Sequence, residues 1–128
     1  MKNALIIMRV FAISILLVSG SGCGIAAKIE EAKNLQINNP DLTKLQDGTY
    51  EGYHESGPVK VLLDITVKDH QIMTIEIRKH DHGRGEKAEE IIESILSAQS
   101  LDVDVITRAT VSSKIILKAA ENALTVNQ

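Results

Sequence analysis

The sequence predicts an α+β fold, in which two helices pack on a small antiparallel sheet, preceded by a signal or lipoprotein segment and a polar tether. Three observations predict it: two neighbouring stretches with alternating apolar residues, two later stretches with helical apolar spacing, and an apolar run near the N-terminus. The chain has 128 residues, a length that fits one compact domain.

The N-terminal segment has the pattern of a signal peptide. Lys2 and Arg9 supply positive charge, the run from Val10 to Val18 is apolar, and small residues lead to Cys23. Because Arg9 interrupts the apolar stretch, the remaining run is short for a membrane span. We therefore expect residues 1–22 to be a signal peptide and the protein to be exported.

Cys23 is the only cysteine, so it can form no intramolecular disulfide. A cysteine at the end of a signal segment resembles the lipobox of bacterial lipoproteins, although Gly20 stands where the lipobox usually has Leu. Lipidation of Cys23 would anchor the protein at the outer face of the cytoplasmic membrane. An ordinary cleaved signal and an uncleaved N-terminal anchor are the alternatives.

Residues 23–46 are polar and poorly periodic, so we expect a tether with one short helix between Ala26 and Leu35. The Asp47-Gly48 pair is a turn signal and marks the start of a folded domain that covers residues 47–128.

Period-two alternation predicts a hairpin on either side of the polar turn "KDHQ", with one face buried and the other in water. The apolar residues expected on its buried face are Val61, Leu63, Ile65, Val67, Met73, Ile75 and Ile77.

Helical spacing follows in two places. The first helix is expected from Glu86 through "AEEIIESIL", and the second from Val111 to Leu124. The buried stripe of the second consists of Ile115, Ile116, Ala119, Ala120 and Ala123. Between the helices, residues 101–106 are predicted to form a short strand.

The composition argues against a nucleic-acid partner. The formal net charge is −3, and Phe11, Tyr50 and Tyr53 are the only aromatic residues. A nucleic-acid surface would instead need clustered Lys or Arg and stacking aromatics.

Several hydroxyls stand directly before the last helix, and Thr110 lies where that helix should begin. One interpretation is that Thr110 caps the helix, because Ser and Thr are favoured at that position. The other is that its hydroxyl carries a phosphate ester, which a helix N-terminus would stabilise. The residues alone leave both open.

The segment "DVITRAT", residues 104–110, resembles the flavinylation motif of FMN-binding domain proteins, Asp-x-x-Ser/Thr-Gly-Ala-Thr. This family includes the covalent-flavin subunits of the Rnf and sodium-pumping NADH:quinone oxidoreductase complexes, and small exported lipoproteins. The stretches "DGTYEG", "HGRGEKAEEIIESILSAQS" and "KAAENAL" also follow the family's order over residues 47–124.

The resemblance implies that Thr110 is the acceptor of a covalent FMN. A magnesium-dependent flavin transferase would take the FMN from FAD and would read Asp104, Thr107 and Ala109. The family's usual Gly is Arg108 here, which would either block attachment or pair with the phosphate. The family's role is electron transfer, so the expected partners are a flavin transferase, a membrane redox donor and an extracytoplasmic acceptor. The remaining expected flavin contacts are Ser112, Ser113, His82, Gly83, Gly85 and Lys87.

The other candidate residues have weaker support from the sequence. His80 and His82 form an H-x-H pair on one strand face, which would bind a metal, lie in a solvated loop or contact the flavin. No third ligand has a recognisable spacing, so no metal ligand is assigned. Tyr50 and Tyr53 would either stack on a flavin ring or simply pack in the sheet. His54 and His70 are expected in exposed loops.

We assign no catalytic residue and expect an electron carrier rather than a stand-alone enzyme. The alternative is a non-redox envelope binding module that holds FMN non-covalently or not at all, which Arg108 would favour. An enzyme that reduces a small substrate would normally need a further domain.

Overall fold

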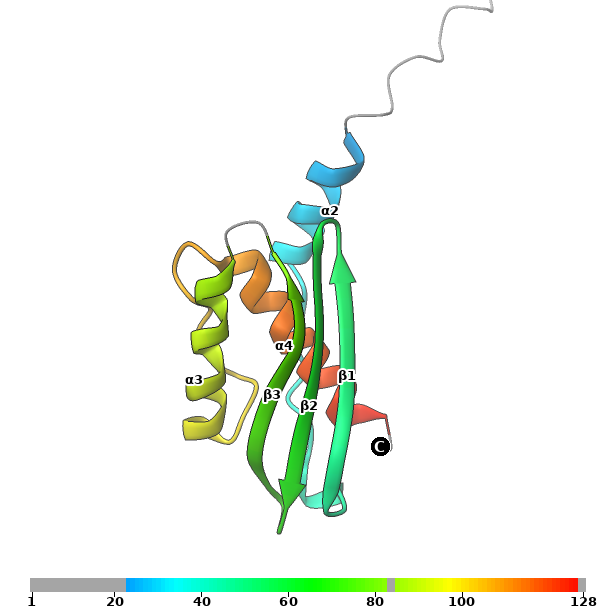
Figure 1. The fold of residues 1–128 in the computed structure, drawn as a ribbon, viewed down its shortest axis with the longest axis vertical. Helices are drawn as coiled ribbons and strands as arrows, with labels where there is room; N and C mark the ends of the chain where they lie inside the picture. Colours follow the sequence, from blue (N-terminus) through cyan, green and yellow to red (C-terminus); the bar gives the residue numbers. More distant parts are fainter. Residues whose placement is uncertain (1–22, 83–84, 127–128) are drawn as a thin grey trace, which may run out of the picture.

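The computed structural model describes residues 23–82 and 85–126. The elements, in chain order, are α2 (Cys23–Lys33), the 3-10 helix η1 (Leu42–Lys44), β1 (Gly48–Ser56), β2 (Val59–Lys68), β3 (Gln71–Asp81), the 3-10 helix η2 (Glu86–Glu90), α3 (Ile91–Ala98) and α4 (Thr110–Thr125) (Figure 1). The predicted signal peptide lies outside the described residues. No helix within them is both long and apolar enough to cross a membrane.

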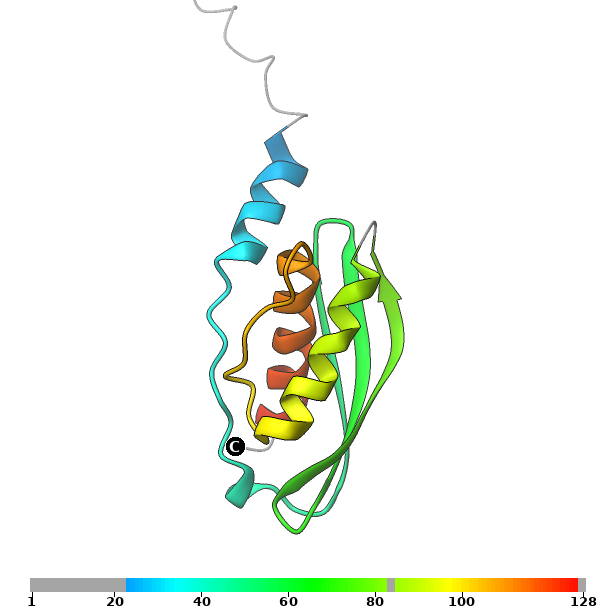
Figure 2. The same ribbon diagram turned by 90° about the vertical axis from the view of Figure 1, so that its left-hand side faces the viewer.

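The three strands form one antiparallel sheet in the order β1-β2-β3. Helices α3 and α4 lie on the same side of this sheet (Figure 2). The predicted α+β class, with an antiparallel sheet covered on one face, is therefore confirmed. On the other face, Arg78 of β3 forms ion pairs with Glu51 at 2.9 Å and Asp64 at 3.5 Å across the strands.

The alternation predicted for β2 is confirmed, because Val61, Leu63, Ile65 and Val67 are all buried. In β3 the prediction for Met73 is wrong: its side chain is 51% exposed, whereas Ile72 is buried. Thr66 pairs with Thr74 and Val67 pairs with Ile72, so Met73 is an extra residue in β3. Such a bulge reverses the phase of the alternation.

Residues 101–106 form no strand, contrary to prediction. Side chains take up backbone donors that a sheet would use: Leu101 N–H donates to Asn39 Oδ1 at 2.9 Å, and Ile106 N–H donates to Ser113 Oγ at 3.0 Å. Buried backbone groups need partners, and these partners come from side chains rather than from a strand.

Helix α4 is the centre of the molecule. Every residue of its predicted stripe is buried, and so are Leu117, Glu121 and Leu124. The additional burial arises because the helix is covered on both sides. The sheet lies on one side, and the segment that follows α2 runs along the helices on the other (Figure 2).

The segment expected to be a tether contributes to this packing. Ala32 and Leu45 are buried. The backbone N–H and the side-chain amide of Asn38 both donate to the Glu121 carboxylate, at 3.1 Å each. The expected short helix is present as α2, displaced slightly toward the N-terminus.

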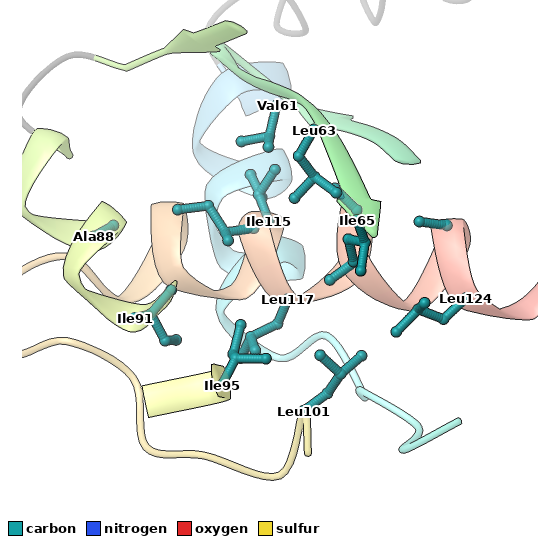
Figure 3. Packing of buried hydrophobic residues seen from close by; sticks show 14 of the residues in the cluster. Val61, Leu63, Ile65, Ala88, Ile91, Ile95, Leu101, Ile115, Leu117 and Leu124 are labelled. Atoms are coloured by element: carbon teal, nitrogen blue, oxygen red, sulfur yellow. The ribbon is translucent and has the colours of Figure 1, made fainter. Parts of the chain in front are cut away.

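The core consists mainly of Ile, Leu, Val and Ala side chains from β2, η2, α3 and α4 (Figure 3). Helix α4 also approaches β1 closely at Gly52, where an added Cβ would clash with Ala119 O and lie 2.7 Å from Ala123 Cβ. Only glycine fits there, since any side chain would push the helix away from the sheet.

Candidate functional site

Helix α4 begins without a side-chain cap. Ala109 occupies the N-cap position, and Thr110 is the first helical residue. The cap interpretation of Thr110 is therefore wrong, although the residue does stand at the helix start. Since the first-turn N–H groups of a helix have no intrahelical acceptor, this end offers unpaired donors and positive dipole character to an anion.

A tight turn leads into this helix. The Ala109 N–H donates to Ile106 O at 2.9 Å, and Arg108 has a φ of 69°. A positive φ at the third residue of a turn is the conformation that favours glycine. The Ser113 hydroxyl, which accepts from the Ile106 N–H, holds the turn against the first helical turns.

A pocket of about 370 Å³ opens in front of the helix start. Its size is within the usual range for small-molecule and cofactor sites. It is lined by Ile29, Lys33, Pro58, Val59, Gly85, Arg108, Ala109, Thr110, Val111 and Ser112. The walls therefore combine apolar side chains with two cations and a half-buried threonine.

Gly85 forms the floor between the end of β3 and α4. A Cβ at this position would clash with Ser112 Oγ, lie 2.7 Å from Ser112 Cβ and lie 3.3 Å from His82 Cβ. The backbone at Gly85 therefore packs directly on the first turn of α4, which requires glycine.

The structure brings together part of the predicted site. Thr110, Arg108, Ala109, Ser112 and Gly85 line the pocket. Ser113 is fully buried behind it. Asp104, Thr107 and Lys87 are exposed and are absent from the pocket lining, and Gly83 lies outside the described residues.

Five pocket residues were not predicted from the sequence: Ile29, Lys33, Pro58, Val59 and Val111. Ile29 and Lys33 come from α2, in the segment expected to be a tether. Pro58 lies in the β1–β2 turn, Val59 is the first residue of β2, and Val111 lies in the first turn of α4. No local motif marks the first four, because they reach the pocket only through tertiary packing. The α2 helix, the β1–β2 turn and the start of α4 meet at one end of the molecule (Figure 1).

His80 and His82 lie beside this pocket. Their ring centroids are 4.4 Å apart, so the expectation that they share a face is confirmed. The His80 side chain is 2% exposed, and its Nδ1 lies 2.9 Å from Glu89 Oε1. Sequence spacing did not identify Glu89 as their neighbour, since it reaches them from η2.

The remaining candidates lie elsewhere. Tyr50 donates to Gln46 O at 2.7 Å and Tyr53 donates to Glu55 Oε2 at 2.6 Å; neither lines the pocket. His70 is exposed in the β2–β3 turn, as expected. His54 was expected in an exposed loop, but it is half-buried in β1, and burial, followed by the nearby Lys118 charge, lowers its pKa.

Residues 52–125 match the family model described as "FMN-binding domain", which covers more than half of the chain. The chain belongs to the FMN-binding domain family. A relative from Treponema pallidum (strain Nichols), named only as an uncharacterized protein, is 31% identical over 101 residues. The match covers 77% of the present chain and 28% of that relative, so the chain spans less than a third of its length.

The residues around the pocket of this FMN-binding domain fit the chemistry of FMN. The uncapped start of α4 and the Arg108 and Lys33 side chains suit a phosphate, because unpaired N–H groups and cations bind anions. Ile29, Pro58, Val59 and Val111 offer apolar contacts of the kind that a flat ring system needs.

Proposed function

We propose that this FMN-binding domain protein carries FMN joined by a phosphoester bond to Thr110 and uses it to transfer electrons outside the cytoplasmic membrane. The observation that carries the proposal is the position of Thr110. It is the first residue of an uncapped helix and lines a pocket of cofactor size. A phosphate on its hydroxyl would lie among first-turn N–H groups that have no intrahelical acceptor.

Attachment would be a phosphoryl transfer from FAD. The Thr110 Oγ–P bond forms, the pyrophosphate bond of FAD breaks, AMP leaves and the hydroxyl proton is released. A flavin transferase with magnesium would perform this step, because the described residues that line the pocket include two cationic side chains, Lys33 and Arg108, but no carboxylate or imidazole. The exposed Asp104 and Thr107 stand on the surface just before the pocket, where such an enzyme would read them.

Arg108 has two features that support attachment. It already has the positive φ that explains a glycine in the family motif, so the turn forms with arginine present. Its side chain lines the same pocket as Thr110 and would pair with the phosphate. These features favour the covalent carrier over a module that holds FMN loosely or not at all.

The bound flavin would supply one- and two-electron chemistry, and the protein would orient it and limit its contact with water. A covalent bond suits an exported carrier, since a free cofactor would be lost by diffusion. We propose a membrane redox protein as the donor and an extracytoplasmic protein as the acceptor, with lipidated Cys23 keeping the domain at the membrane.

Intact mass of the exported chain, produced together with an active flavin transferase, tests the attachment. The wild type should gain the mass of FMN minus water, and Thr110→Ala should not. The matched control is Thr74→Ala, which removes an exposed hydroxyl on β3 and should leave the gain unchanged. The attached flavin should bleach on reduction and recover its absorbance on reoxidation.

An unmodified wild type beside a transferase that modifies a second substrate domain would contradict covalent attachment. So would an undiminished mass gain in Thr110→Ala. Anchoring is tested separately, because Cys23→Ser should move the protein from the membrane fraction to the soluble fraction without changing the flavin content.

A further inference from the structure

His80, His82 and Glu89 come together at the end of β3 for a reason that lies in the strand. Leu63 pairs with Ile77 and Leu62 pairs with Lys79, so Arg78 is an extra residue. This second bulge turns His80 to the covered face, opposite the buried Val61. An imidazole therefore occupies a position that would otherwise suit an apolar side chain.

The hydrogen bonding of the two imidazoles is incomplete. His80 Nδ1 pairs with Glu89 Oε1 at 2.9 Å, and this is an ordinary imidazole–carboxylate contact. His80 Nε2 and His82 Nδ1 are both buried and have no hydrogen-bond partner among the described residues. Leaving two polar atoms unpaired in a buried position is costly, and such groups require an explanation.

The three side chains are close enough together to surround one metal ion. One ligand atom from each residue lies within 4.8 Å of the other two. Donor atoms around a tetrahedral Zn²⁺ lie about 3.4 Å apart, given bonds of about 2.0–2.1 Å. The donor atoms would thus need to approach one another by up to about 1.4 Å, which side-chain rotations can supply.

We propose that His80 and His82 bind a divalent transition-metal ion such as Zn²⁺ through His80 Nε2 and His82 Nδ1. Glu89 accepts the hydrogen bond from His80 Nδ1–H and so fixes the ring and its tautomer. This carboxylate–imidazole–metal arrangement is common in protein metal sites. Water or another donor would fill the remaining coordination positions.

The metal would have a structural consequence. It would hold the two imidazoles at the end of β3 together and, through the contact between His80 and Glu89, would reinforce the packing of β3 on η2. Because His82 Cβ and Ser112 would both lie close to a Cβ at Gly85, the site would also support the floor of the flavin pocket. The proposal does not depend on flavin attachment, because none of the three residues lines the pocket.

Zinc titration of the full chain, freed of metal by a chelator, tests the site. A Cys23→Ser background removes the single thiol that would compete. A chromophoric chelator as competitor should report one saturably bound Zn²⁺ per chain. His82→Gln should lose this binding, and Glu89→Gln should weaken it by about 10–100-fold. His70→Gln is the matched control, because that histidine is exposed in the β2–β3 turn. The Zn²⁺ affinity of this variant should equal that of the parent.

His80 is buried, so His80→Gln is informative only if its circular dichroism matches that of the parent. A thermal melt gives an independent readout: Zn²⁺ should raise the melting temperature of the parent and of Thr110→Ala equally, and should leave His82→Gln unshifted. Equal Zn²⁺ affinity in His82→Gln and the parent, or no saturable binding at all, would overturn the proposal. Because Thr110→Ala retains the metal site, failure of flavin attachment and failure of metal binding are distinguishable.

Discussion

Gly85 packs so closely on Ser112 that an added Cβ would lie 2.7 Å from the serine Cβ. This contact joins the end of β3 to the first turn of α4, directly beneath the pocket. Both residues are buried, so neither can move aside into solvent.

Gly85→Ala should therefore lower the free energy of unfolding by about 1–3 kcal/mol, the usual cost of overpacking. Chemical denaturation measures the effect. Gly24→Ala is the control, since nothing lies within 4 Å of a Cβ at that position of α2. Ser112→Gly should partly relieve the clash, so the double variant should be less destabilised than the sum of the two single variants. If the changes in the free energy of unfolding of the two single variants added strictly in the double variant, there would be no steric clash between the two positions.

Arg108 stands where the family motif has glycine, and its φ of 69° identifies the reason. The left-handed conformation is about 1–2 kcal/mol less stable for a residue other than glycine. Glycine avoids this strain but loses about 0.4–1 kcal/mol through greater freedom of the unfolded chain.

Arg108→Gly should consequently leave the free energy of unfolding unchanged or raise it by up to about 1.6 kcal/mol. Arg108→Ala, which keeps the strain and removes only the guanidinium, should not stabilise. Denaturation of the three proteins separates backbone strain from side-chain contacts. If Arg108→Gly were clearly destabilised while Arg108→Ala was not, the positive φ at this turn would be in doubt.

The sequence predicted the elements whose pattern is local. The alternation of β2 and the stripe of α4 follow from residues next to each other in the chain, and both are confirmed. The motif around Thr110 likewise identified residues that share one turn and one helix start. What the sequence did not predict depends on distant partners. The contribution of Ile29 to the pocket arises from packing, and the hydrogen bond from Leu101 to the distant Asn39 stands where a strand was predicted.

The bulge at Met73 gives a direct check on this account. Period-two alternation places Met73 in the core, whereas the register of β3 places Ile72 there. Ile72→Ala should therefore lower the free energy of unfolding by about 2–5 kcal/mol, and Met73→Ala should change it by no more than about 0.5 kcal/mol. Thermal or chemical denaturation of the two variants compares them directly. If Met73→Ala lowered the free energy of unfolding more than Ile72→Ala, the simple alternation would be right and the bulge would be wrong.

The pair formed by Asn38 and Glu121 should make stability depend on acid pH. Burial opposes ionisation of Glu121, but the hydrogen bonds from Lys118 and Asn38 outweigh it and hold its pKa below the ordinary 4.5. A carboxyl with a lowered folded-state pKa stabilises the fold fully above its unfolded-state pKa. This contribution is lost as the pH falls through the folded-state pKa.

Glu121→Gln should lower the free energy of unfolding at pH 7 by about 1–3 kcal/mol, because charged hydrogen bonds are weakened at a buried position. The difference in the free energy of unfolding between wild type and variant should stay constant down to about pH 5. Below that it should become smaller as the pH falls toward the lowered folded-state pKa of Glu121. Denaturation at a series of pH values measures this gap, and the other acidic groups cancel because both proteins contain them. The exposed Glu76→Gln is the control and should show no such narrowing. A gap that widened on acidification would mean that the pKa of Glu121 is raised in the folded protein, and that burial outweighs the contacts that anchor the segment around Asn38.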